Sequence, residues 1–156
     1  MEHLDAVARN RVLEIINQAN DMTLATVRPD GYPQATTVCY ANEGLTLFVG
    51  IGLGSQKAAN IQFHNKVSST INLAYSDWNH SRGLSLSGTA EFVRGEEEIG
   101  HVAKLLLQKF PQFGSISPGP GATPVEGMLF LRIRPIIISL LDYRLGFGHT
   151  ELYSVA

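Results

Sequence analysis

The chain has 156 residues, which is enough for one domain with a single hydrophobic core. Its formal net charge of -2, with only 17% charged residues, gives no electrostatic reason to expect nucleic acid or an anionic membrane surface as a partner. The single cysteine, Cys39, excludes an intrachain disulfide and a cysteine-rich zinc site, and its place in the β-like run TTVCYA predicts a small buried residue. No apolar run is long enough to cross a membrane and the N-terminus carries no secretory signal, so we expect a cytoplasmic protein.

The first third of the chain predicts a helix followed by a meander of strands. Apolar residues at helical spacing indicate an amphipathic helix over 3–19, which makes residues 1–20 an N-terminal helical segment. Turn-forming residues at Asp30-Gly31 and at 42–44 separate three predicted antiparallel strands, over 22–28, 34–41 and 45–51. This order excludes a βαβ unit at the start of the chain.

The rest of the chain adds two helices and three strands to this pattern. The helices are expected over 56–65, with Ser55 as N-cap, and over 95–110, with acidic residues in its first turn. The strands are expected over 66–76, 84–94 and 126–142, with Pro135 at a bulge or an edge. A Pro/Gly-rich loop over 111–124 and a tail over 143–156 remain. The whole pattern predicts one mostly β (α+β) domain over 1–156, a small barrel or curled sheet with peripheral helices.

The stretch VGIGLGSQKAAN, residues 49–60, is the first candidate for a binding site. Its glycines follow G-x-G-x-G, which fails the spacing of the dinucleotide fingerprint, and GSQKA lacks the Gly-Lys-[Ser/Thr] of a P-loop. A third interpretation is that Ser55 caps a helix whose first-turn amides, together with Lys57, suit a phosphate group. The residues alone leave open an ordinary capped helix with an exposed lysine.

The wider context of this stretch resembles the pyridoxamine 5′-phosphate oxidase-like family of FMN-binding split barrels. The resemblance covers about residues 20–95, and the matching positions are Gly54-Ser55-Gln56-Lys57-Ala58, Ile61, Asn65, Val67-Ser68, Gly88 and Ala90-Glu91. The tail LDYRLGFGHTEL is similar to a C-terminal segment in one branch of the same superfamily. The resemblance implies a six-stranded antiparallel split β-barrel that forms a homodimer, with FMN in grooves at the interface and residues 143–156 near the cofactor.

Carried over by position, the resemblance also implies the cofactor-binding residues. The phosphate is expected at Ser55, Gln56 and Lys57. The flavin ring is expected against the second and third strands, at Thr36, Thr37, Val38, Val49, Gly50 and Ile51. The partner subunit is expected to contribute from the region of Trp78 and Arg82 and from His149 in the tail, although an ordinary turn, a surface ion pair and a surface tail residue are the alternatives for these three.

The sequence departs from the oxidase pattern at several of these positions. Gln56 stands where the family commonly has Arg, and Gly83 stands where the oxidase has a cofactor-contacting Gln. The second strand carries Thr and Val where oxidases place an Arg and a Lys, and GFGHTEL differs from their Arg-x-His substrate signature. We therefore expect a phosphate held by less charge, and we do not expect oxidation of pyridoxamine phosphate itself.

The function implied is that of an FMN-dependent oxidoreductase that acts by flavin hydride transfer on a small molecule. No catalytic side chain is assigned, and no metal is expected because His64 and His101 lie on helices without spaced partners. The alternatives left open are a non-catalytic or stress-response flavin-binding protein and a barrel that uses a deazaflavin or haem. Haem would need an axial histidine ligand, and the candidates for it are His149 and His80.

Overall fold

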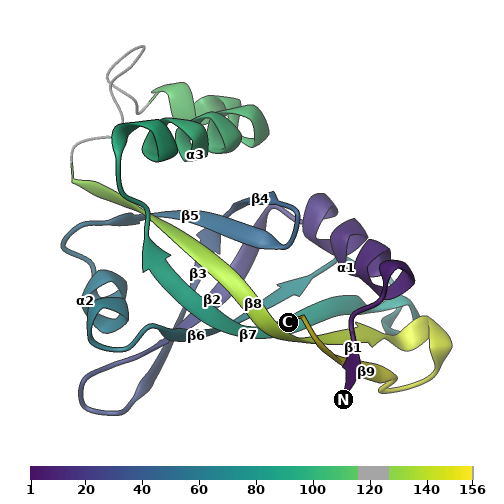
Figure 1. The fold of residues 1–156 in the computed structure, drawn as a ribbon. Coiled ribbons are helices and arrows are strands. Elements are labelled where there is room, and N and C mark those ends of the chain that lie inside the picture. The colour runs from purple at the N-terminus through teal and green to yellow at the C-terminus, as the bar shows by residue number, and fades with distance from the viewer. Residues whose placement is uncertain (116–126, 156) are drawn as a thin grey trace.

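One sheet of nine strands, with three α-helices and three short 3-10 helices, makes up residues 1–115 and 127–155, which the computed structural model describes (Figure 1). The strands are β1 (Glu2–His3), β2 (Asp21–Val27), β3 (Pro33–Cys39), β4 (Ala41–Glu43), β5 (Thr46–Gly52), β6 (Lys66–Asn72), β7 (Arg82–Phe92), β8 (Met128–Asp142) and β9 (Thr150–Ser154). The α-helices are α1 (Ala6–Gln18), α2 (Gln56–Phe63) and α3 (Glu96–Lys109), and the 3-10 helices are η1 (Trp78–His80), η2 (Pro111–Ser115) and η3 (Tyr143–Leu145). No helix in these ranges is long and apolar enough to cross a bilayer.

The six predicted strands and three predicted helices are confirmed, as β2, β3, β5, β6, β7 and β8 and as α1, α2 and α3. The short strands β1, β4 and β9 were not predicted, and because β1 runs parallel to β9 the sheet is mixed and not purely antiparallel. The predicted loop over 111–124 begins with η2, and its remainder lies outside the described residues.

Six strands curl into a barrel in the order β3-β2-β6-β7-β8-β5, and each neighbouring pair is antiparallel. The register of β7 on β8 shifts between Ser87 and Gly88, and Gly88 is paired with Pro135. This shift is the bulge expected at that proline. Gly88 is needed at this point because a Cβ would lie 2.4 Å from the carbonyl oxygen of Arg134.

The barrel is split between β3 and β5, which lie close together but form no ladder in the described part of the chain. Only Tyr40 separates β3 from β4, and β4 pairs with the first half of β5, residues 46–48. β3 itself pairs with β2. The second half of β5, residues 49–52, is therefore bonded to β8 on one edge and leaves its other edge open toward β3.

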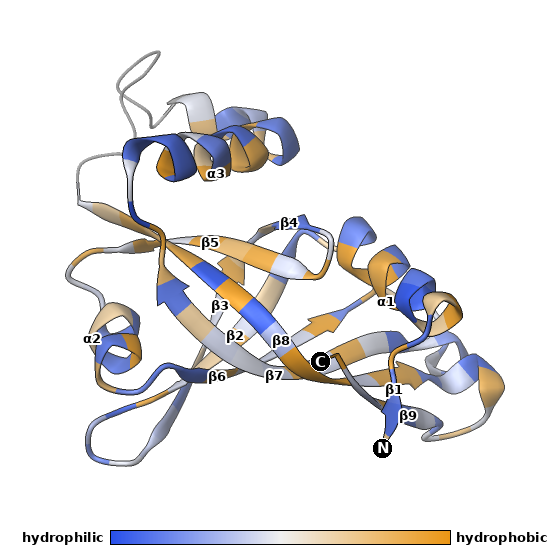
Figure 2. Ribbon diagram, viewed as in Figure 1, coloured by the Kyte–Doolittle hydropathy of each residue, from blue (hydrophilic) through white to orange (hydrophobic). Residues whose placement is uncertain are grey.

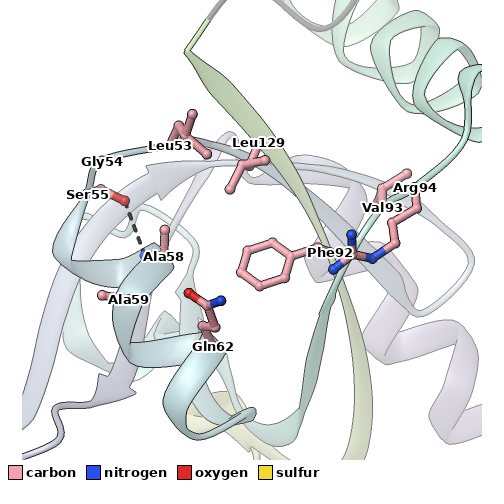
Figure 3. Close-up of a pocket in the computed structure, with 10 residues that line it drawn as sticks. All are labelled: Leu53, Gly54, Ser55, Ala58, Ala59, Gln62, Phe92, Val93, Arg94 and Leu129. Carbon is pink, nitrogen blue, oxygen red and sulfur yellow. Dashed lines mark hydrogen bonds between the residues drawn. The ribbon is translucent and has the colours of Figure 1, made fainter.

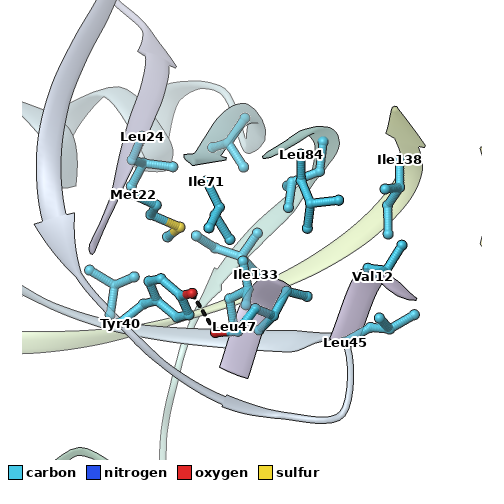
Figure 4. Close-up of a cluster of buried hydrophobic side chains, with 14 of the residues drawn as sticks. Val12, Met22, Leu24, Tyr40, Leu45, Leu47, Ile71, Leu84, Ile133 and Ile138 are labelled. Atoms are coloured by element: carbon cyan, nitrogen blue, oxygen red, sulfur yellow. Dashed lines mark hydrogen bonds between the residues drawn. The ribbon is translucent and has the colours of Figure 1, made fainter. Parts of the chain in front are cut away.

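Apolar side chains from the strands and from α1 fill the barrel (Figure 4). Alternation along β2 and β6 places every second residue inside, and β5 is apolar over most of its length (Figure 2). α1 packs on this core with Val12, Ile15 and Ile16 fully buried. The buried hydroxyl of Tyr40 donates a hydrogen bond to the Ile16 carbonyl oxygen at 2.6 Å, which satisfies a carbonyl in the last turn of α1 (Figure 4).

α3 packs outside the barrel on β5 and β8, around a second apolar cluster that includes Phe48, Val102, Leu106 and Phe130. Lys109 ties the end of α3 to the end of α1, because its Nζ donates to the Ala19 carbonyl oxygen at 2.7 Å and lies 3.8 Å from the centre of the Tyr40 ring. Burial lowers the pKa of Lys109.

The prediction that Cys39 is buried is wrong, because its side chain is exposed. Residues 33, 35, 37 and 39 of β3 all lie on the outer face of the strand, and each of them is exposed. The run TTVCYA is apolar enough for a core strand, but β3 lies at the edge of the split and is covered on its inner face only.

Candidate functional site

A pocket of about 580 Å³ lies over the open seam between β3 and β5. Three of the elements predicted to bind a cofactor line it, through Thr37, Val38 and Cys39 of β3, Gly50, Ile51 and Gly52 of β5, and Lys57 of α2. The opposite wall comes from α3 and its C-cap Phe110, from η2 and from the first residue of β8. Its other members are Leu106, Gln112, Phe113 and Met128. The fold therefore brings the predicted segments of β3, β5 and α2 together at one place.

The backbone of β5 forms part of this pocket because Gly50 has no side chain. A Cβ at Gly50 would lie 3.1 Å from Met128 Sδ and 3.6 Å from Phe130 Cε1, so a larger residue would crowd the lining. Val49, which was also predicted to lie against the flavin ring, is fully buried, and its side chain points into the barrel core and not into the pocket. Thr36 is absent from the lining as well, and its buried Oγ1 has no hydrogen-bond partner in the described residues.

Lys57 is the one charged side chain among the described residues that line the pocket, and it forms no ion pair within residues 1–115 and 127–155. The remaining lining is apolar or neutral, with two glycines. Such a surface suits a flat apolar group that carries an anion at one end.

The three residues predicted to hold a phosphate lie in different surroundings. Ser55 caps α2, because its Oγ accepts a hydrogen bond from the Ala58 amide at 3.2 Å. Gln56 is bonded within the helix, since its Nε2 donates to Asn60 Oδ1 at 2.9 Å. Of the three, only Lys57 lines the pocket at the seam.

Ser55 instead borders a smaller pocket of about 330 Å³ on a different face of α2 (Figure 3). Gln62 of α2 and Phe92 at the end of β7 point into this space, and Arg94 lies at its edge (Figure 3). Residues 55, 58, 59 and 62 share a face by helical periodicity, whereas Lys57 is turned away from it. α2 thus separates the two pockets.

Trp78 lies far from the seam, at the opposite end of β8. It belongs to an exposed aromatic cluster with Tyr143 and Phe147, and its ring meets Phe147 edge-on at 5.2 Å between centroids. The 15-residue strand β8 begins with Met128, in the pocket, and ends just before this cluster. Trp78 does not line the pocket of its own chain.

Arg82 and His149 lie at the same end and also do not line the pocket of their own chain. Arg82 Nη1 is 3.3 Å from Glu14 Oε1, so it forms a surface ion pair with α1. His149 Nε2 is 3.4 Å from Glu151 Oε2, which is close enough for an ionic contact when the ring is protonated but is not aligned as a hydrogen bond. Arg11 holds Glu151 in turn and, through this hydrogen bond, lowers the pKa of that carboxyl.

Sequence reasoning missed the apolar wall formed by Leu106, Phe110, Phe113 and Met128. The apolar face of the third helix was predicted, but a face of this kind gives no sign of whether it meets a core or a pocket. In the structure it does both, because Leu106 is buried in the second cluster and also borders the seam.

A family model described as pyridoxamine 5′-phosphate oxidase matches residues 8–125, about three quarters of the chain. The chain belongs to the pyridoxamine 5′-phosphate oxidase family. The matched range contains most of α1, the strands β2 to β7, and Lys57 of the pocket. No curated protein matches the chain significantly.

Solved structures of this family's fold resemble the chain over most of its length. A conserved hypothetical protein of Mycobacterium tuberculosis is 24% identical, with a TM-score of 0.75 and coverage of 91% of this chain and 89% of the other. A haem-binding protein of Mycobacterium smegmatis is 20% identical, with a TM-score of 0.77 over 96% of this chain and 58% of the other. HutZ, the haem storage protein of Vibrio cholerae, is 18% identical, with a TM-score of 0.67 over 81% and 88%. At these identities the likeness establishes the split-barrel fold.

Proposed function

We propose that this member of the pyridoxamine 5′-phosphate oxidase family is a cytoplasmic FMN-binding flavoprotein that acts as an oxidoreductase on a small molecule. The observation that carries the proposal is the pocket at the seam, where Lys57 and the open edges of β3 and β5 meet an apolar wall. Its volume of about 580 Å³ falls within the range of small-molecule sites.

The residues present fit FMN. The unsubstituted backbone at Gly50 and Gly52 allows a flat ring to approach β5, and Phe110 and Phe113 offer apolar surface to the ring. Lys57 can donate a charge-assisted hydrogen bond to the phosphate. No acidic side chain occurs among the described residues of the lining, so nothing there repels an anion.

When bound, FMN supplies hydride chemistry at its N5 atom. The chain's own residues then have three tasks: Lys57 anchors the anionic end, the backbone of β5 orients the ring, and the wall formed by α3 and η2 keeps water away. No side chain has to move a proton, which agrees with a lining in which Lys57 and Cys39 are the two titratable side chains among the described residues.

A homodimer is part of this proposal. The middle of the outer face of the sheet from β3 to β7 carries small uncharged residues, namely Ala35, Thr37, Thr23, Ala25, Ser68, Thr70, Ser85 and Ser87, and the exposed charged residues Asp21, Lys66 and Glu91 lie near the ends of their strands. Soluble surfaces usually carry interspersed charges, so a second copy is the simplest cover for this face. Trp78, Arg82 and His149 could reach a cofactor only in the pocket of such a second copy.

Haem is the second candidate, because two of the structural neighbours are haem proteins. None of the described residues that line the pocket is a histidine, so His149 or His80 of a second copy would have to supply an axial ligand. The same pocket is also compatible with two other functions: a flavoprotein with little turnover, and a protein that binds a deazaflavin. The deazaflavin's acidic tail would need more than the single cation, Lys57.

The test is the absorbance spectrum of the purified protein, together with mass analysis of whatever molecule co-purifies. A flavin spectrum and the mass of FMN are expected. Failure to bind added FMN would refute the proposal, and a Soret band after haem titration that His149→Ala abolishes would favour haem. Oxidation of NADH or NADPH across a panel of small acceptors separates an oxidoreductase from a flavin-binding protein without turnover.

A further inference from the structure

A buried asparagine joins α2 to the hairpin of β2 and β3. Asn60 is 0% exposed, and its Nδ2 donates to Thr26 Oγ1 and to Gln34 Oε1, both at 3.0 Å. Its Oδ1 accepts the hydrogen bond from Gln56 Nε2 at 2.9 Å. One amide therefore bonds to side chains from β2, β3 and α2.

Such an arrangement fixes position more strictly than apolar packing would. A buried amide is costly unless its donors and acceptor are all bonded, and its bonds are directional. Thr26 and Gln34 are paired with each other in the ladder of β2 and β3. The two hydrogen bonds that Asn60 donates therefore fix α2 beside this one residue pair.

The position of α2 matters because the pocket has no backbone ladder across it. Within residues 1–115 and 127–155, β3 and β5 are not paired with each other along the seam, so sheet hydrogen bonds do not set the distance between the β3 wall and Lys57. Lys57 lies one turn before Asn60 on α2, and Thr37 lies three residues after Gln34 on β3. The hydrogen bonds of Asn60 directly connect α2, which carries Lys57, to β3, which carries Thr37.

We propose that Asn60 is the positioning residue of the candidate cofactor site. It holds Lys57 at a fixed place relative to β3, and it keeps Gln56 bonded within the helix, so that the anion is bound by Lys57 without help from Gln56. This inference rests on the proposed function, since the anion is the phosphate of FMN.

The measurement that isolates this role is the ratio of FMN affinity to riboflavin affinity. The two ligands share the ring system and differ by the phosphate, so a misplaced Lys57 lowers the ratio. General damage to the fold lowers both affinities together and leaves the ratio unchanged. Both affinities are measured by quenching of flavin fluorescence, and the thermal transition of each variant is recorded beside them.

Four variants complete the experiment. Asn60→Ala removes the network, and Gln34→Leu removes only the hydrogen bond to β3, at a half-buried residue that does not line the pocket. Ile61→Ala is the matched control, because Ile61 is a buried neighbour on α2 with an apolar environment. Lys57→Met sets the ratio expected when the cation is lost.

We expect Asn60→Ala to lower the FMN-to-riboflavin ratio about tenfold, close to the value of Lys57→Met, and Gln34→Leu to lower it about threefold. Combining Asn60→Ala with Lys57→Met should lower it less than about twofold further, because both changes remove one interaction. Ile61→Ala should leave the ratio unchanged.

A ratio within twofold of the unaltered protein in Asn60→Ala would overturn the inference while leaving the proposed function intact. If Asn60→Ala has no cooperative thermal transition, Gln34→Leu decides by the same criterion. If the unaltered protein binds neither flavin, the proposed function itself fails and the inference fails with it.

Discussion

Replacing Lys57 by methionine tests the electrostatic part of the site. Methionine keeps most of the apolar length of the side chain and removes the one cation among the described lining residues. Gln56 cannot compensate while its amide is bonded to Asn60. Loss of one charge-assisted hydrogen bond costs about 1.5–3 kcal/mol, which corresponds to a roughly 10- to 150-fold increase in the dissociation constant for FMN.

The assay is a fluorescence titration with FMN and, in parallel, with riboflavin, which lacks the phosphate. Riboflavin affinity is expected to change less than about twofold, because the ring contacts are unaltered. Lys57 is only half-buried and forms no ion pair among the described residues, so the free energy of unfolding should change by less than about 0.5 kcal/mol.

Lys104→Met is the matched control, since Lys104 is an exposed lysine of α3 that does not line the pocket. It should leave both affinities unchanged. The reasoning would be refuted if Lys57→Met bound FMN as tightly as the unaltered protein, or if it lost FMN and riboflavin affinity equally.

Three further substitutions test the pocket, the bulge and the C-terminal ion pairs. Gly50→Val should fill the pocket beside β5 and weaken FMN binding at least about tenfold with an unchanged circular dichroism spectrum, and unaltered affinity would place the ring elsewhere. Gly88→Ala should lower the free energy of unfolding by about 2 kcal/mol or more in urea, because the new Cβ would meet the Arg134 carbonyl oxygen, and a neutral effect would mean that the bulge adjusts freely. The hydrogen bond from Arg144 lowers the pKa of Asp142 below its ordinary value of 3.8, so this carboxylate stabilises the fold above that pH and the contribution is lost as the pH falls through the lowered pKa. Asp142→Asn should therefore lower the free energy of unfolding by about 1–2 kcal/mol at pH 7, and should weaken its fall with decreasing pH on the acid side. Parallel plots of the free energy of unfolding against pH for the two proteins would contradict this assignment.

Local sequence signals were sufficient for the main elements because each of them depends on neighbouring residues. Alternation in β2 and β6, the Ser55 cap of α2 and the proline at the bulge are all read within a few positions of the chain. β1, β9 and β4 escaped prediction because two- to five-residue strands carry too few positions for a periodicity, and β1 and β9 are paired with each other across the whole chain.

The same distinction applies to the site. The resemblance pointed to β3, β5 and α2, and the fold brings Thr37, Val38, Gly50, Ile51 and Lys57 to one pocket. The resemblance also named Val49, Gln56 and Ser55, which do not line this pocket. Their side-chain directions depend on the pleat of β5, on the hydrogen bond from Gln56 to Asn60 and on which face of α2 meets which pocket. Nor could the resemblance separate the two faces of β3 and so predict that Cys39 is exposed.

By itself, the sequence determined the order of the main elements and the family, and it predicted a weakly charged phosphate site at Ser55, Gln56 and Lys57. Tertiary structure decided where the barrel stays open, that α3 forms the apolar wall of the pocket, and that Asn60 connects α2 to β3. The physical reason is that periodicity and capping act over one or two turns of the chain. The seam, the wall and the buried amide instead bring together residues that are roughly 10 to 90 positions apart, and no local pattern indicates which of them will meet.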